Sequence, residues 1–92
     1  MTHIDEINAE RIARMTGLLT DSLNPTHLSI VDESHLHAGH VGAKTGKGHF
    51  FVEITSDEFT SVSPVKKHQL IYGALGEMMQ SDIHALRISA KS

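Results

Sequence analysis

The sequence predicts an α+β fold in which a three-stranded mixed sheet carries its helices on one face. Apolar residues recur at helical spacing over residues 4–23 and 64–80, whereas β-rich runs occupy 27–32, 50–55 and 85–89. The resulting order is α-β-β-α-β. The connection between the last two strands is itself helical, which favours a parallel pair beside an antiparallel hairpin. One layer of helices on such a sheet is a stable two-layer arrangement.

The length and composition indicate a single domain over residues 1–92 and exclude several classes of protein. The chain has no cysteine, so it forms neither a disulfide framework nor a zinc–thiolate site, and we expect a cytoplasmic protein. No apolar run approaches the roughly 20 residues of a membrane span, and the N-terminal residues lack the pattern of a signal peptide. The net charge of −3 argues against strong nonspecific binding of nucleic acid.

The first helix is amphipathic and ends at a clear signal. Charged side chains, among them Glu10, Arg11 and Arg14, alternate with its apolar residues and mark the polar face. Asn24 and Pro25 end the helix because proline lacks the backbone donor and restricts the residue before it. The apolar residues at helical spacing are Ile4, Ile7, Ile12, Met15, Leu18, Leu19 and Leu23.

The second half of the chain carries a further helix and the last strand. Residues 56–59 are typical of a short helical turn. Ser63 and Pro64 then start a helix, with a capping hydroxyl and a proline at the first helical position. The spacing continues to about Gln80 through Val65, His68, Ile71, Tyr72, Leu75, Met78 and Met79.

A glycine-broken, histidine-rich connection separates the first two strands. It contains Gly39, Gly42, Gly46 and Gly48, which indicate a loop. Imidazole is the commonest metal ligand in proteins, so such a loop is a candidate site for zinc, copper, nickel or iron. Solvated histidines that bind nothing are the alternative. The histidines of this stretch are His35, His37, His40 and His49.

The predicted topology brings the starts of the second and third strands to this loop, and each start carries a histidine. In an antiparallel hairpin the loop lies beside the start of the second strand, where His49 is found. A parallel third strand starts at the same end, and His84 immediately precedes it. We therefore expect His49, His84 and the loop histidines to converge at one edge of the sheet. Histidines on one iron of a cluster, with thiolates from elsewhere on the other, are a known coordination.

Several short motifs in this chain resemble the BolA-like family, in the family's order and over nearly the whole chain from Ile4. The matching positions are 32–35, 49–50, 59, 63, 67–68, 72, 75 and 84–86. The resemblance implies a fold similar to the type II KH domain. It also implies a complex with a monothiol glutaredoxin in which the two proteins share a [2Fe-2S] cluster, in iron–sulfur trafficking or in iron and redox regulation.

The resemblance also implies the cluster ligands. In the family these are a residue of the loop between the first two strands and a histidine at the start of the last strand. By position the second is His84 and the first is His37, with His35 and His40 as alternates. The glutaredoxin and its glutathione supply the sulfur ligands. The family's usual arginine before the helical histidine is Lys67 here, which lacks the planar fork for bidentate contacts.

Other interpretations lead to different tests. A transcriptional regulator that binds nucleic acid would use Lys66 and Lys67, although a GXXG clamp should join two helices, and the tetrad at 39–42 falls between strands. We expect no enzyme, because no nucleophilic cysteine or Gly-x-Ser-x-Gly motif is present. His68 is expected to be a structural or partner-contact residue whose removal lowers stability. We expect a monomer or a weak homodimer that binds no membrane.

Overall fold

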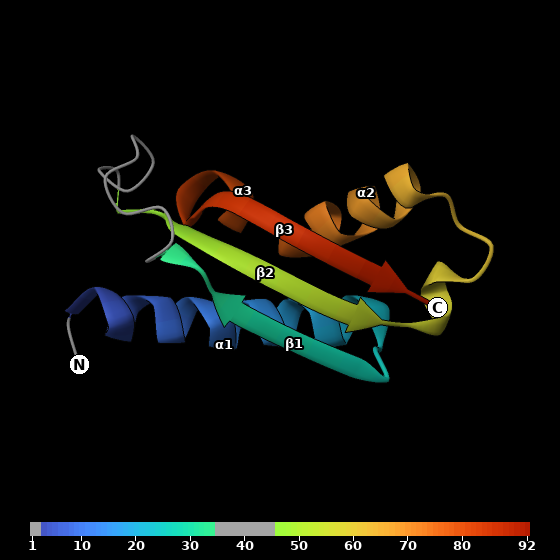
Figure 1. The fold of residues 1–92 in the computed structure, drawn as a ribbon, viewed down its shortest axis with the longest axis horizontal. Coiled ribbons are helices and arrows are strands. Elements are labelled where there is room, and N and C mark those ends of the chain that lie inside the picture. The colour runs from blue at the N-terminus through green and yellow to red at the C-terminus, as the bar shows by residue number, and fades with distance from the viewer. Residues whose placement is uncertain (1–2, 35–45) are drawn as a thin grey trace.

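The computed structural model describes residues 3–34 and 46–92, with side chains from residue 6 onward. Its three-stranded sheet has the order β1-β2-β3, as predicted, and two main helices lie against one of its faces (Figure 1). The elements are α1 (His3–Leu23), β1 (His27–Asp32), β2 (Gly48–Thr55), η3 (Asp57–Phe59), α2 (Pro64–Leu75), α3 (Met78–Ser81) and β3 (Ile83–Lys91). The expected α+β class and mixed sheet are confirmed.

The strand pairing follows the predicted topology. β1 and β2 are antiparallel, with Val31 opposite Phe51, and β2 and β3 are parallel, with Phe51 opposite Arg87. The start of β2 and the start of β3 therefore lie at the same end of the sheet (Figure 1). The end of β1 lies there too, because Asp32 pairs with Phe50. This end of the sheet is called the histidine edge below, because His49 and His84 both belong to it.

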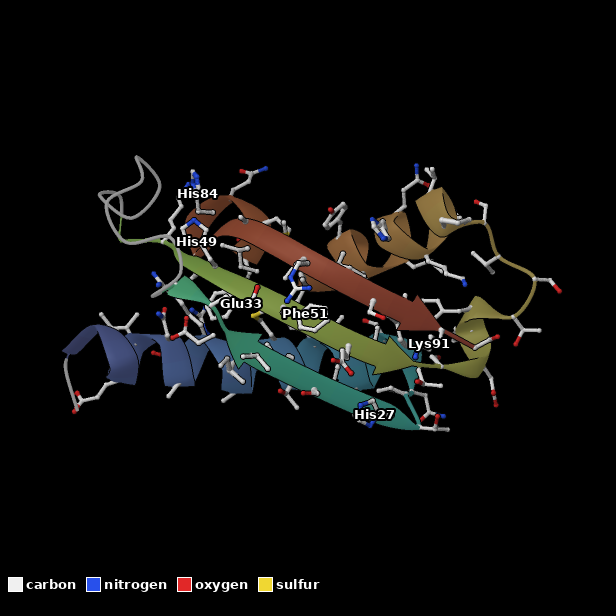
Figure 2. All side chains as sticks on the ribbon, in the orientation of Figure 1. His27, Glu33, His49, Phe51, His84 and Lys91 are labelled. Atoms are coloured by element: carbon white, nitrogen blue, oxygen red, sulfur yellow. The ribbon has the colours of Figure 1, made fainter. Side chains whose placement is uncertain are left out.

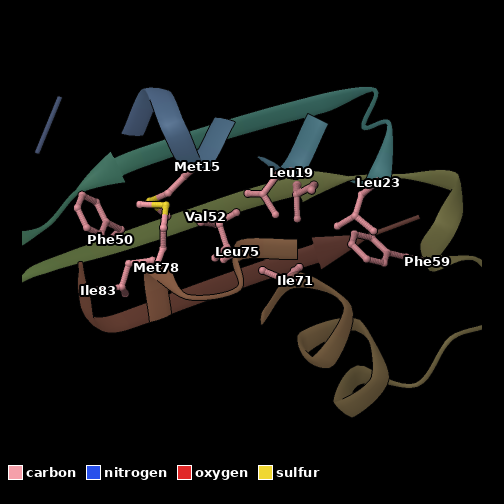
Figure 3. Packing of buried hydrophobic residues seen from close by; sticks show 11 residues of the cluster. Met15, Leu19, Leu23, Phe50, Val52, Phe59, Ile71, Leu75, Met78 and Ile83 are labelled. Carbon is pink, nitrogen blue, oxygen red and sulfur yellow. The ribbon is translucent and has the colours of Figure 1, made fainter. Parts of the chain in front are cut away.

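The core forms between the helices and one face of the sheet (Figure 3). Alternate residues of β2 point into it, because successive side chains of a strand face opposite sides. Burial of these apolar side chains provides the main driving force for folding. The buried apolar residues are Met15, Leu19, Leu23, Phe50, Val52, Ile54, Phe59, Ile71, Leu75, Met78 and Ile83.

The second predicted helix is divided in two. α2 ends at Leu75, and the next residue, Gly76, has φ 57° and ψ −128°, which breaks the helical backbone before α3. The expected apolar face of α2 is also narrower than predicted, because Val65 is 68% exposed and Tyr72 is 40% exposed. The buried side chains of this helix are Ile71 and Leu75, and the partly buried Leu70 and Ala74 pack against the core beside them.

The caps and ends of the other elements agree with the sequence. Asn24 has φ 45° and donates its N–H to Thr20, so α1 stops where Asn24 and Pro25 were expected to stop it. Ser63 caps α2, and its side-chain oxygen accepts a bond from the Lys66 N–H. Both later strands are longer than expected, since β2 starts at Gly48 and β3 at Ile83.

Candidate functional site

His84 lies near the start of β3, where the strand register shifts. Gly48 of β2 pairs with Ile83, but the next residue, His49, pairs with Ala85. His84 is therefore an extra residue in β3, a β-bulge, and its side chain is exposed. Bulges re-aim side chains and are over-represented beside functional sites. This bulge places the His84 imidazole at the surface of the histidine edge.

His49 supplies a second imidazole beside it (Figure 2). The ring centroids of His49 and His84 lie 5.1 Å apart, and the ring planes are tilted by 58°. His49 is 4% exposed, so the pair joins one buried ring to one exposed ring. The expected convergence of these two residues is confirmed, although His84 lies inside β3 and does not precede it. The predicted topology placed His49 at this edge, but His49 was not among the predicted ligands.

The predicted loop ligands His35, His37 and His40 lie outside the described residues. The chain that leads to them is described, and it ends at the histidine edge. The Glu33 N–H donates to the His49 carbonyl oxygen at 2.7 Å, and the His49 N–H donates to Ser34 Oγ at 3.0 Å. The segment 35–45 therefore follows directly from a residue bonded to His49. Within the ranges 3–34 and 46–92, no group of three or more potential metal-ligating side chains gathers.

A buried polar network centred on Arg11 of α1 holds this edge against the helix. Arg11 Nε lies 3.0 Å from Asp82 Oδ2, and Arg11 Nη1 donates to Asn8 Oδ1 at 2.9 Å and to the Gly46 carbonyl at 2.8 Å. Asn8 Nδ2 donates to Asp32 Oδ2 at 3.1 Å. Asn8 is 2% exposed and Arg11 is 9% exposed. The network therefore joins α1 to the C-terminal end of β1, to Gly46 ahead of β2, and to Asp82, the residue before β3.

This network was not predicted, because Arg11 was assigned to the polar face of the first helix. A signal was available in the spacing. Asn8 and Arg11 lie seven and four residues before Met15, and Leu19 follows four residues after it, so all four share one helical face. Since Met15 and Leu19 are fully buried, the two polar residues on their face are buried as well. Buried polar groups are hydrogen-bonded in folded proteins, which makes such a network the expected outcome.

Asp82 receives bonds from three side chains. Ser81 Oγ donates to Asp82 Oδ1 at 2.6 Å, and Arg14 Nη2 lies 2.6 Å from Asp82 Oδ2, the oxygen that Arg11 also contacts. These bonds, that from Ser81 first, lower the pKa of the Asp82 carboxyl below its ordinary value. Asp82 therefore remains a carboxylate at neutral pH. Its carbonyl oxygen accepts a bond from the Gly48 N–H at 2.9 Å, which ties the start of β3 to the start of β2.

Arg87 of β3 reaches across β2 to Glu33, the residue after β1. Its guanidinium bonds both carboxylate oxygens of Glu33, at 2.6 and 3.2 Å, and its carbon centre lies 3.8 Å from the centroid of the Phe51 ring. The Glu33 contact raises the pKa of Arg87. Isolated exposed ion pairs stabilise a fold only slightly, but a bidentate arginine–carboxylate pair is an exception. Arg87 thus ties β3 to the residue after β1 next to the histidine edge.

The residues of the alternative interpretations lie elsewhere. Lys66 is exposed and Lys67 is half-buried, both in the first turns of α2. His68 is exposed, with its ring centroid 6.2 Å from that of Tyr72 in an edge-on arrangement. A solvent-exposed ring contact has little energetic weight, so a large stability loss on removal of His68 is no longer expected. The GXXG tetrad at 39–42 lies outside the described residues.

A shallow open hollow of about 170 Å³ lies at the other end of the sheet, where His27 and Lys91 are found (Figure 2). His27 pairs with Thr55, and Thr55 pairs with Lys91, so these residues form the row farthest from the histidine edge. The hollow is therefore separate from the candidate site. Its lining residues are His27, Glu53, Ile54, Thr55, Ser89 and Lys91.

The sequence model of the BolA-like protein family matches residues 19–92 of this chain. The chain belongs to the BolA-like family. Among curated BolA-like relatives, the chloroplastic protein BOLA1 of Arabidopsis thaliana is 40% identical over 85 residues, which cover 89% of this chain and 53% of the relative. Human BolA-like protein 1 is 36% identical and is matched over 80% of this chain and 52% of its own length. The chain thus spans about half the length of these relatives.

Solved BolA structures share the fold described above. The BolA domain of SufE1 from Arabidopsis thaliana is 41% identical with a TM-score of 0.77, covering 88% of this chain and 90% of that domain. Arabidopsis BolA1 is 40% identical with a TM-score of 0.74, covering 86% of this chain and 87% of its own. Since relatives of this BolA-like chain include proteins named as chloroplastic, a cytoplasmic location does not follow from family membership. No helix among the described residues is long and apolar enough to cross a membrane.

Proposed function

We propose that this BolA-like chain binds a monothiol glutaredoxin and contributes histidine ligands to a [2Fe-2S] cluster held between the two proteins. The role is one of binding, in cluster trafficking or in iron and redox regulation, and it needs no catalytic residue. The observation that carries the proposal is the bulge in β3, which presents the exposed His84 imidazole beside His49 at the histidine edge.

The donor set of this edge is consistent with such a cluster. Imidazoles on one iron with sulfur ligands on the other are an established coordination, and this chain has no thiolate of its own. A partner must therefore supply the sulfur. An exposed imidazole on a strand bulge is accessible to a ligand shared with a partner, whereas a ligand for an enclosed metal site would be buried.

His84 is the proposed ligand from β3, and a histidine of the segment 35–45 is the second. His37 is the first choice for that ligand by its position in the family resemblance, with His35 and His40 as alternates. The His49 ring centroid lies 5.1 Å from that of His84, and His49 is included in the test for that reason. When bound, the cluster would supply redox chemistry that no side chain here possesses.

The proposal predicts that His84→Ala alters the spectrum of the shared cluster. The measurement is a titration of the chain into cluster-loaded monothiol glutaredoxin with glutathione, followed by visible absorption and circular dichroism. The unmodified chain should change the spectrum and saturate at one-to-one. His84→Ala should abolish or alter that change while the far-ultraviolet spectrum stays the same, because the side chain is exposed and outside the core. Parallel variants at His37, His35, His40 and His49 identify the second ligand.

His27→Ala is the matched control. It removes an exposed imidazole at the far end of the sheet and should leave the cluster spectrum unchanged. A His84→Ala chain whose titration matches that of the unmodified chain would count decisively against His84 as a ligand. An unmodified chain that neither changes the spectrum nor co-elutes with the glutaredoxin would remove the proposal altogether.

A further inference from the structure

The Arg11 network is placed where it can control the geometry of the histidine edge. Its contacts reach both described flanks of the segment 35–45. On the preceding side, Asn8 Nδ2 donates to Asp32 Oδ2 and to Ser34 Oγ, at 3.1 and 3.3 Å. On the following side, Arg11 donates to the Gly46 carbonyl at 2.8 Å. Since Arg11 also donates to Asn8, one guanidinium links the two flanks through a single intermediate side chain.

The same guanidinium also holds the chain segment that precedes His84. Arg11 Nε lies 3.0 Å from Asp82 Oδ2, two residues before the bulge. The backbone of Asp82 accepts from the Gly48 N–H, the residue before His49. A displacement of Asp82 therefore moves the starts of β2 and β3 relative to one another, and with them both rings of the pair.

The planar fork of arginine suits this role. Arg11 uses two nitrogens of its planar guanidinium to bond three groups, a carboxylate, an amide oxygen and a backbone carbonyl. Lysine carries the same charge on a single nitrogen without a fixed fork. Apolar residues of similar volume often replace buried ion pairs at no cost in stability, so stability alone gives no reason for a buried arginine here. What the fork adds is a defined distance between three separate chain segments.

We propose that Arg11 is a positioning residue that sets the relative placement of the His49 and His84 imidazoles and of the flanks of the segment 35–45. The proposal rests on the proposed function for its biological meaning, since the groups being positioned are the proposed cluster ligands. Arg11 itself contacts no described histidine side chain in this arrangement and acts through Asn8, Gly46 and Asp82.

The test compares Arg11→Lys with Arg14→Lys. Both substitutions keep the charge, and both residues contact the same Asp82 oxygen, but Arg14 is exposed and its other ion pair is with Glu10 on the same helix. In the isolated chain with chelator present, NMR measures the nuclear Overhauser effect between carbon-bound ring protons of His49 and His84. Arg11→Lys should lose this effect and shift both ring resonances. Arg14→Lys should retain the effect and the resonance positions of the unmodified chain.

A second readout uses the mixed complex with cluster-loaded glutaredoxin. Arg11→Lys should change the visible circular dichroism of the shared cluster, and Arg14→Lys should not. If Arg11→Lys does not fold, Asp82→Asn replaces it, because that change removes the ion pair and keeps the backbone bond from Gly48. A variant that is less stable yet keeps the ring contact and the cluster spectrum would overturn the proposal and leave Arg11 a purely structural residue.

The two proposals fail in different ways. If the unmodified chain leaves the glutaredoxin spectrum unchanged, the proposed function fails, while the NMR comparison still decides whether Arg11 positions the two rings. If the unmodified chain changes the spectrum but Arg11→Lys behaves as the unmodified chain does in both readouts, only the role of Arg11 is rejected.

Discussion

Gly48 occupies a position where no side chain fits. A Cβ atom built there would lie 2.5 Å from two atoms of the Phe50 ring and 3.1 Å from Asn8 Oδ1. Phe50 is 1% exposed and belongs to the core, and Asn8 belongs to the Arg11 network, so neither neighbour can move away freely. The first residue of β2 must therefore be a glycine for the core and the network to meet at this point.

Gly48→Ala is accordingly expected to destabilise the fold by about 1–3 kcal/mol, the usual cost of forcing extra atoms into a packed site. Denaturant unfolding followed by circular dichroism measures the change. Gly17→Ala is the control, because its Cβ would meet nothing within 4 Å and alanine favours a helix interior over glycine by about 1 kcal/mol. If Gly48→Ala and the unmodified chain have equal denaturant midpoints, the Phe50 ring moves aside more easily than its burial implies.

Some residues of the candidate site could be predicted from the sequence, and others could not. His84 and His49 were recognised because the predicted topology brings their two strand starts together. Arg11 was not, since a charged residue among other charged residues on a helix resembles a solvated face. Its burial depends on Asn8, Gly46 and Asp82, which lie far apart in the sequence. The helical spacing signals that Arg11 is buried, but its bonds to Gly46 and Asp82 leave no local signal in the sequence.

At the scale of elements, the division between α2 and α3 depends on one backbone conformation. Apolar residues keep helical spacing across it, so the sequence predicts a single helix to Gln80. Gly76 interrupts that helix with φ 57° and ψ −128°, and its N–H donates to the Tyr72 carbonyl at 2.9 Å. The turn lets α3 approach the start of β3, and Met78 from α3 joins Ile83 in the core.

Gly76→Ala should therefore cost about 1–3 kcal/mol, because this combination of angles is nearly restricted to glycine. Gly73→Ala, one turn earlier in α2, is the matched control. Its Cβ would meet nothing within 4 Å, and the substitution should stabilise the chain by about 0.5–1 kcal/mol. Thermal unfolding of the two variants in parallel gives the comparison. If the unfolding temperature of Gly76→Ala is no lower than that of Gly73→Ala, then the helix continues through Gly76, as the periodicity predicts, and the break is not required.

The bulge in β3 is the element-scale feature that the sequence does not predict. Alternation and β-propensity locate the strand, but the register depends on how Ile83 packs in the core and how Asp82 is held. Both of these are tertiary contacts. The sequence therefore located the last strand and its histidine but not the register shift that exposes His84.

At the scale of the whole molecule, the predicted topology is the strongest result of the sequence analysis. The order of elements, the mixed sheet and the convergence at the histidine edge follow from periodicity and from the handedness of strand connections. The identity of the second proposed ligand cannot be predicted in this way. Three candidate histidines lie within a few residues of one another, and no local rule distinguishes them.

The charge of the whole molecule bears on the nucleic-acid alternative. The chain carries a net charge of −3, and the two lysines proposed for binding, Lys66 and Lys67, differ in exposure. Binding to duplex DNA depends on neutralising several phosphates and weakens steeply with salt. We expect no binding to duplex DNA at physiological salt by fluorescence anisotropy. Tight binding that weakens steeply with added salt, and that is lost in Lys66→Ala, would revive the regulator as the main function.

The histidine edge depends on contacts between residues that are distant along the chain. The hairpin of β1 and β2 is local, but the β2–β3 ladder is not, and Arg11 and Asp82 are 71 positions apart. Contacts of such sequence separation are slow to form during folding. A chain with β3 still undocked has its histidine-rich segment but no bulge and no ring pair. The proposed sharing of a metal cluster would therefore require a completely folded chain, because an incompletely folded molecule lacks the pair of rings on which the proposal rests.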